Sequence, residues 1–290
     1  MKKKSTFQPA QLSELLHVVH VRMEVEHFSE STVNCYLHAI KQLCVFTDKL
    51  PDSMGEEDIY AYLAHLKNEK HLCRETIRNH LQGIRFVFKR LYKRIDIIQD
   101  VPYPRQTKRL PVILSSKELK LLFASAPGLK HRIILKIAYS GGLRRNEISR
   151  LKLVDIDTKN HLIRVENSKG NKDRYTLLAK SLVPELGEYY RKYKPQKYLF
   201  NGRIKGFPYS EEGLRWTFDQ ALQKSGIHKQ VSLHSLRHAF ASHLLAMGTD
   251  LFTIQKLMGH DDIRTTMVYL QVNHQLRKAK LVSPLDLICQ

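Results

Sequence analysis

SLHSLRHAFASHLL, residues 232–245, decides the fold because it places cations inside an apolar helical pattern. At about 100° per residue, one face of the predicted helix is apolar and carries Leu233, Leu236, Phe240, Leu244 and Met247. The adjacent face carries His234, Arg237, His238 and Ala241. Since the apolar face predicts a core helix, we expect the cationic face to border a cleft or solvent.

His234 and His238 stand at i and i+4, a spacing that also suits a metal site. The zinc-peptidase motif has a glutamate after the first histidine, whereas this chain has Ser235. Arg237 on the same face would repel a divalent cation. We therefore expect no metal and no cofactor here.

The charge balance points to a polyanionic partner. The 290 residues include 48 Lys+Arg against 28 Asp+Glu, a formal net charge of +20, and the pI is near 9.8. Such a field favours nucleic acid. A basic surface without a partner, or an anionic membrane, is the alternative, but the basic residues recur along the chain instead of forming one amphipathic anchor.

Cysteine usage and hydropathy indicate a cytoplasmic protein with no membrane association. Cys35, Cys44, Cys73 and Cys289 form no CxxC pair, which is typical of free thiols in a reducing compartment. No apolar run reaches the roughly 18 residues that a spanning helix needs, and MKKKS at the start is not followed by a signal-peptide core.

The N-terminal part is predicted to be a four-helix domain. From Leu12 to Arg94, apolar residues recur at intervals of three and four between polar breaks. The fourth predicted helix, Thr76–Lys93, has an apolar stripe on one side. Its other side gathers basic residues that we expect to contact a nucleic-acid backbone: Arg74, Arg78, Arg85, Lys89 and Arg90.

A linker separates this domain from the rest of the chain. The stretch DVPYPRQTKRLPVILS, residues 100–115, contains prolines that a helix cannot accommodate. Its basic residues Arg105, Lys108 and Arg109 are candidates for phosphate contacts. The predicted organisation is a helical DNA-binding domain at 1–100, a linker at 101–112 and a second domain at 113–290.

The second domain is predicted to be mainly α-helical with one small sheet. Short helices precede residue 151, and helices resume at Lys180. Between them, residues 154–179 alternate apolar and polar side chains around turns at TKN and SKGNKD. This pattern predicts a three-stranded antiparallel sheet.

Three further motifs add cations and a tyrosine. YSGGLRRNEISRL, residues 139–151, places Arg144 at the start of a predicted helix, where backbone N–H groups also favour an anion. SKGNKDR, residues 168–174, puts Lys169 and Lys172 in a hairpin turn. MGHDDIRTTMVYL, residues 258–270, sets His260 in a turn and Tyr269 two turns into the next helix.

In this order, the motifs GGLRRNEI, SKGNKDR, LHSLRHAFASHLL and LMGHDDIRTTMVYL resemble the tyrosine recombinase family, also called the phage integrase family. The resemblance extends over nearly the whole chain and is closest to Xer-type recombinases and to transposon and phage integrases. It implies site-specific cleavage and rejoining of double-stranded DNA through a covalent 3′-phosphotyrosyl bond, without metal or ATP. Two departures, Ser168 in place of glycine and Arg145-Asn146 in place of smaller residues, remove no catalytic group.

The resemblance also implies residue roles. Arg144 and Arg237 would clamp the scissile phosphate, with His234 and His260 completing the pocket. Tyr269 would be the nucleophile.

Supporting roles follow from the same comparison. Lys169 would protonate the leaving oxygen, with Lys172 as the alternative. Glu147 would buttress the pocket, and His238 would support it.

Tyrosine has an ordinary pKa of about 10, so attack at neutral pH requires a proton acceptor or a cationic pocket. His234 is the better candidate for that acceptor and His260 for a hydrogen bond to the phosphate, a division that the sequence leaves open.

The C-terminal segment, about 271–290, is expected to dock on a neighbouring protomer in a tetramer on DNA, the alternative being that it packs on its own domain. A second recombinase or an accessory protein is a further possible partner. Two other functions stay open: a type IB topoisomerase-like enzyme that relaxes DNA, and a DNA-binding protein with a silent pocket. The presence of all six candidate catalytic positions favours strand exchange over a silent binder.

Overall fold

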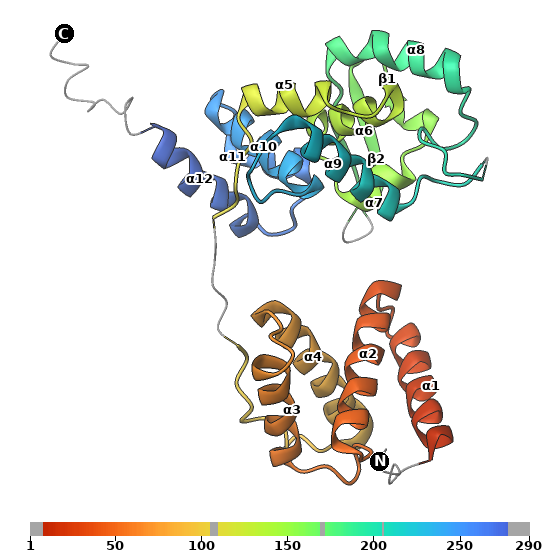
Figure 1. Ribbon diagram of the computed structural model, residues 1–290, viewed down its shortest axis with the longest axis vertical. Helices are drawn as coiled ribbons and strands as arrows, with labels where there is room; N and C mark the ends of the chain where they lie inside the picture. The colour runs from red at the N-terminus through yellow and green to blue at the C-terminus, as the bar shows by residue number, and fades with distance from the viewer. Residues whose placement is uncertain (1–7, 105–109, 169–171, 205, 278–290) are drawn as a thin grey trace, which may run out of the picture. The chain divides into compact units, whose positions relative to one another are not determined.

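The computed structural model describes residues 8–104, 110–168, 172–204 and 206–277, and of these it leaves the side chains of 167–168, 172 and 272–277 undescribed. The chain divides into two compact units, residues 1–108 and 109–290. Each is described by itself (Figure 1). In the described part of the chain, no helix is both long enough and apolar enough to cross a membrane.

The first unit contains the four helices that the sequence predicts: α1 (Pro9–Val25), α2 (Glu30–Thr47), α3 (Glu56–Asn68) and α4 (Arg74–Val87), the last continued by a π-helical turn at Phe88–Tyr92. Ser29 caps α2 by accepting a hydrogen bond from the backbone of Thr32. The predicted apolar stripe of the fourth helix is buried. These helices pack around one hydrophobic core.

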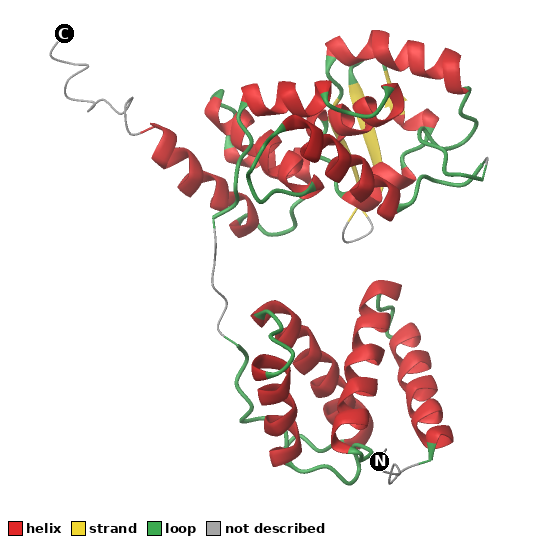
Figure 2. Ribbon diagram, in the orientation of Figure 1, coloured by secondary structure: helices red, strands yellow, loops and turns green. Residues whose placement is uncertain are grey.

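The second unit is a helical domain around a small sheet (Figure 2). Its helices are α5 (Ser116–Ala124), α6 (Leu129–Ser140), α7 (Arg145–Arg150), α8 (Val183–Tyr193), α9 (Glu211–Ser225), α10 (Leu233–Ala246), α11 (Leu251–Met258) and α12 (Arg264–Arg277), with short 3₁₀ turns at Leu153–Asp155 and Lys180–Leu182.

The predicted antiparallel sheet is confirmed, with strands in the order β1 (Ile156–Asp157), β2 (Leu162–Ser168) and β3 (Lys172–Leu177). Ile163 of β2 pairs with Thr176 of β3, and both are fully buried.

Helix α10, which carries the opening stretch, lies at the centre of this unit and packs against α6, α9, α11 and α12. Leu233 and Leu236 join the main core, while Phe240 and Leu244 join a second cluster with α11 and α12. The helix is therefore buried on more than the one apolar face that the pattern predicts. Met247, expected in that stripe, is instead 73% exposed because it follows the last helical residue.

Candidate active site

Arg237 lies in the interior of the second unit, with only 1% of the residue exposed. Its guanidinium donates to the carbonyl oxygens of Gly142 and Met258, each at 2.5 Å. On the face expected to border a cleft or solvent, His234 is exposed, whereas the guanidinium of Arg237 is enclosed by two backbone carbonyls. Burial and the neighbouring Arg144 lower the pKa of Arg237 to about 9, which still leaves the guanidinium charged at neutral pH.

Gly142 makes this approach possible. Its φ is +58°, and an added Cβ would lie 2.3 Å from the Phe240 ring of α10. No other residue fits this close contact between the α6–α7 turn and α10. The GG of the motif is thus needed for packing, and the packing presents the Gly142 carbonyl to Arg237.

Arg144 lies at the start of α7 and is partly exposed. Its backbone N–H donates to the Glu147 carboxylate at 2.7 Å, so the expected anion-binding role of this N–H is already taken within the chain. The guanidinium donates to Glu147 at 3.0 Å and to the carbonyl of Gly259 at 2.7 Å.

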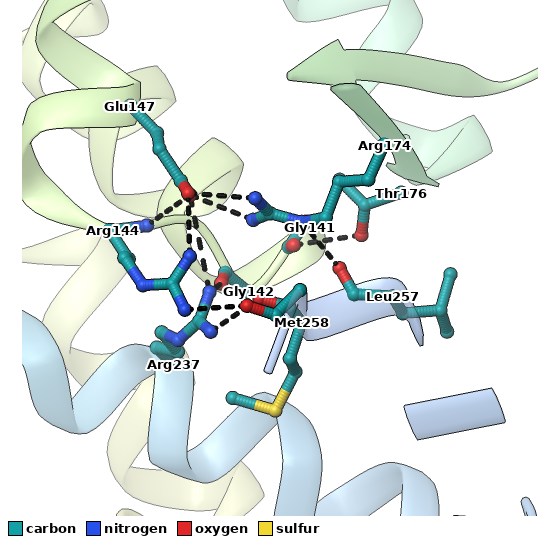
Figure 3. A network of polar contacts seen from close by, with 10 residues as sticks. Gly141, Gly142, Arg144, Glu147, Arg174, Thr176, Arg237, Leu257 and Met258 are labelled. Carbon is teal, nitrogen blue, oxygen red and sulfur yellow. Dashed lines mark hydrogen bonds and ion pairs between the residues drawn. The ribbon is translucent and has the colours of Figure 1, made fainter. Parts of the chain in front are cut away.

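The carboxylate of Glu147 lies among three guanidiniums, those of Arg144, Arg174 and Arg237 (Figure 3). Desolvation by burial opposes its ionisation, but the hydrogen bonds and charges of Arg174 and Arg144 outweigh this and lower the pKa of Glu147 to about 2. With the carboxylate ionised, the cluster keeps an excess of two positive charges. An excess of this kind suits a phosphate.

Tyr269 lies on α12 beside this cluster and is 2% exposed. Its hydroxyl is 2.9 Å from Nδ1 of His238 on α10. Burial raises the pKa of Tyr269 to about 12, although the charges of Arg237 and Arg144 act in the opposite direction. The tyrosine is therefore protonated at neutral pH and needs an acceptor in order to react.

The histidines occupy different positions around the tyrosine. The ring of His234 is exposed and packs edge-on against His238, 4.6 Å between centroids. Burial, with His234 and Arg237 close by, lowers the pKa of His238 to about 4. Partial desolvation and the two clamp arginines lower the pKa of His234 as well.

His260 follows α11 and hydrogen-bonds Thr266 through Nδ1 at 2.8 Å. Burial and the nearby arginines lower the pKa of His260 to about 3. All three histidines are therefore neutral at pH 7, so each is able to accept a proton or to donate one N–H.

Sequence reasoning missed two of these contacts. Arg174 was quoted in the hairpin motif but given no role, and the Thr266 contact to His260 was not foreseen. Strand alternation would have placed Arg174 on the buried face with Thr176, and a buried cation calls for a partner.

Several predicted site residues lie elsewhere or outside the described residues. Lys169, Arg105, Lys108 and Arg109 are outside them, and Lys172 begins β3, although its side chain is not described. Among the described residues, no group of three or more His, Cys, Asp or Glu side chains is arranged to hold a metal ion.

In the first unit, Arg74, Lys89 and Arg90 are exposed. Arg78 and Arg85 stack on the Tyr103 ring, with guanidinium carbons 4.6 and 4.2 Å from its centroid. Arg85 also donates to the Val101 carbonyl at 2.5 Å, so both residues fasten the start of the linker to α4.

A guanidinium cluster with surplus positive charge beside a buried tyrosine suits a site that binds a phosphodiester and attacks it. The second unit matches the phage integrase family at residues 113–275, and the first matches the phage integrase N-terminal SAM-like domain at residues 15–96. The chain belongs to the phage integrase family of site-specific DNA recombinases.

Known relatives agree with this assignment. A putative integrase/recombinase of Sinorhizobium fredii is 38% identical over 251 residues, covering 86% of this chain and 82% of that protein. Tyrosine recombinase XerC of Bacillus pumilus is 30% identical, covering 91% and 94%. A lambda integrase tetramer bound to a Holliday junction shares the fold, with a TM-score of 0.73 at 17% identity over 89% of this chain and 76% of that chain.

Proposed function

We propose that this recombinase cuts and rejoins DNA through a covalent bond between Tyr269 and the 3′ phosphate of the cleaved strand. The observation that carries the proposal is the position of the Tyr269 hydroxyl, which lies against His238 and within the electrostatic influence of Arg237 and Arg144. A tyrosine used only for packing has no need of a cluster with surplus positive charge.

In the proposed step, the Tyr269 oxygen attacks phosphorus, and the bond from phosphorus to the 5′ oxygen of the next nucleotide breaks. The tyrosine gives up one proton, and the departing 5′ oxygen gains one to become a hydroxyl. A 5′-hydroxyl from a second duplex reverses the step, and because the phosphotyrosyl bond retains the energy of the broken linkage, ATP is not required. The guanidiniums stabilise charge that develops on the phosphoryl oxygens, the task that a metal ion performs in other phosphoryl transfers.

We assign the proton acceptor to His238, since it holds the hydroxyl of Tyr269. His234 and His260 then hydrogen-bond the phosphate oxygens. The negative charge of bound DNA offsets the arginines that depress the pKa of His238, so the base strengthens when substrate binds.

Lys169, or Lys172 as the alternative, protonates the leaving oxygen. Because Tyr269 is almost fully covered by α10 and α11, cleavage also requires α12 to shift and uncover it.

Residues 1–100 and the linker at 101–112 supply the DNA backbone contacts, and residues 113–290 supply catalysis. Four chains assemble on two duplexes, each placing its segment of about 271–290 on a neighbour. The similarity to the lambda integrase tetramer supports this assembly. A second recombinase or an accessory protein is compatible with the same arrangement.

The test begins with a pool of random-sequence duplexes, enriched by repeated binding to the full chain. The enriched duplex is then nicked at successive positions, so that the short 5′-hydroxyl fragment diffuses away and cleavage is trapped. We expect a protein–DNA adduct that survives denaturant and is absent from Tyr269→Phe.

Tyr139→Phe is the matched control, since Tyr139 also hydrogen-bonds a histidine, His243, at 2.9 Å. It should form the adduct normally. DNA binding with no wild-type adduct would overturn the proposal in favour of a silent DNA-binding protein. Relaxation of a supercoiled plasmid without exchange between two enriched sites would instead indicate a topoisomerase-like enzyme.

A further inference from the structure

The C-terminal end of α11 gathers the three arginines of the site, of which Arg174 and Arg237 are buried and Arg144 is partly exposed. Carbonyl groups in the last turn of a helix have no partner within the helix and attract cations. Consecutive carbonyls here each accept from a different guanidinium: Leu257 from Arg174 Nε at 2.9 Å, Met258 from Arg237 at 2.5 Å and Gly259 from Arg144 at 2.7 Å.

Arg174 differs from Arg144 and Arg237 in the direction of its two terminal guanidinium nitrogens. It comes from β3, its side chain is 8% exposed, and its two terminal nitrogens donate to the two Glu147 oxygens at 2.7 and 2.8 Å. This bidentate geometry is the strongest that a guanidinium and a carboxylate form.

Glu147 has a second set of partners on its other side. Arg144 donates to it at 3.0 Å, and Arg237 lies 4.0 Å away. A buried carboxylate is stable only when nearby cations neutralise it. Without Arg174, Glu147 would be neutralised by Arg144 or Arg237, the two arginines proposed to clamp the phosphate.

We propose that Arg174 is a positioning residue, which neutralises Glu147 from the hairpin side so that Arg144 and Arg237 keep their charge for the scissile phosphate. The proposal rests on the strand-cleavage function above. The bond from Arg174 Nε to the Leu257 carbonyl also fixes β3 against the end of α11 that leads to His260. The Arg174 side chain thus fixes the position of β3 relative to the phosphate pocket.

The first test compares single-turnover cleavage of the nicked, enriched duplex by the wild type, Arg174→Gln and the double variant Glu147→Gln/Arg174→Gln. Arg174→Gln should cleave about tenfold to a hundredfold more slowly, the effect of losing a hydrogen-bonded charge pair. Removing the carboxylate as well should restore part of the rate, because nothing then competes for the clamp arginines. If the double variant is as slow as the single or slower, the proposal is overturned.

The second readout is the pH profile of the rate ratio, Arg174→Gln to wild type. With its main partner gone and its burial unchanged, Glu147 has a higher pKa and becomes protonated as the pH falls, which releases the clamp. The ratio should therefore rise toward low pH, since histidine titration affects both proteins alike. A ratio that is constant with pH would mean that Arg174 only maintains the fold.

Arg164→Gln is the matched control. It removes an arginine from the same sheet, one that pairs with Asp155 and Glu166 away from the cluster. It should cleave like the wild type. Arg174→Lys keeps the positive charge but loses the bidentate guanidinium, so it should cleave faster than Arg174→Gln. It serves as the measured variant if Arg174→Gln does not fold. A lysine variant that cleaves no faster than the glutamine variant overturns the proposal.

Wild-type adduct formation separates the two hypotheses. Failure of the wild type to form an adduct at Tyr269 rejects the proposed function. A normal wild-type adduct together with an unimpaired Arg174→Gln rejects only the role of Arg174.

Discussion

His238→Asn tests which residue accepts the proton of Tyr269. An asparagine amide reaches about as far as the histidine Nδ1 and preserves a hydrogen-bonding partner for the hydroxyl, but it is not a base. The substitution therefore separates holding the tyrosine from deprotonating it. Since one hydrogen bond is replaced by another, the free energy of unfolding should change by no more than about 1 kcal/mol.

The expected loss of cleavage rate follows from the pKa of Tyr269. With the pKa of Tyr269 at about 12, ionisation at pH 7 lies five pH units uphill, about 7 kcal/mol without an acceptor. General-base catalysis typically recovers about 10²- to 10⁴-fold in rate. The rate of single-turnover cleavage by His238→Asn should fall by this factor while DNA binding stays unchanged.

The pH dependence of the cleavage rate distinguishes the wild type from His238→Asn. In the wild type, His238 with a pKa of about 4 is already neutral, so the rate should be nearly flat between about pH 6 and 8. In His238→Asn, the reaction depends on the small tyrosinate fraction, so the rate should rise about tenfold per pH unit.

His234→Asn is the control, because His234 is exposed and packs against His238, whereas the hydrogen-bonding partner of the Tyr269 hydroxyl is His238. It should lower the rate through phosphate contact and keep the flat profile. If His234→Asn shows the steep profile and His238→Asn the flat one, the acceptor is His234 and our assignment fails.

Three further predictions concern stability. His238 and His260 have pKa values of about 4 and 3 in the folded protein, below the ordinary 6.5 of the unfolded chain. Their contribution to the free energy of unfolding is therefore complete above pH 6.5 and is lost as the pH falls toward 4. Urea titrations should show a loss of about 1–3 kcal/mol per histidine, and a free energy of unfolding that does not change with pH would contradict the burial of these rings. Arg237→Lys should lower the free energy of unfolding by about 1–3 kcal/mol, since one ammonium does not span both carbonyls that the fork joins; unchanged denaturation would refute this bridging role. Tyr103→Leu should speed amide hydrogen exchange in α4 and at the start of the linker, because two cation–π contacts worth about 0.5–1 kcal/mol each are lost. Equal protection in the variant and the wild type would show that this stacking does not stabilise α4.

The helical pattern and the sheet were predictable because they depend on local periodicity. The fourth helix shows this well, since its spaced apolar residues fixed which side is buried. The pattern does not reveal that a polar side faces another part of the chain. Arg78 and Arg85, for which the sequence predicts DNA contacts, also stack on Tyr103, and Arg85 donates to the Val101 carbonyl.

The sequence by itself determined the family, the two units and the order of candidate residues, because motif spacing and periodicity are properties of the chain. Only the tertiary structure decided their partners. It set Tyr269 against His238, and it joined Arg174 of β3 to Glu147 of α7. The physical reason is that a buried charge or hydroxyl takes the nearest partner in space, and residues separated by many turns of chain become neighbours only when α10, α11 and the hairpin pack together.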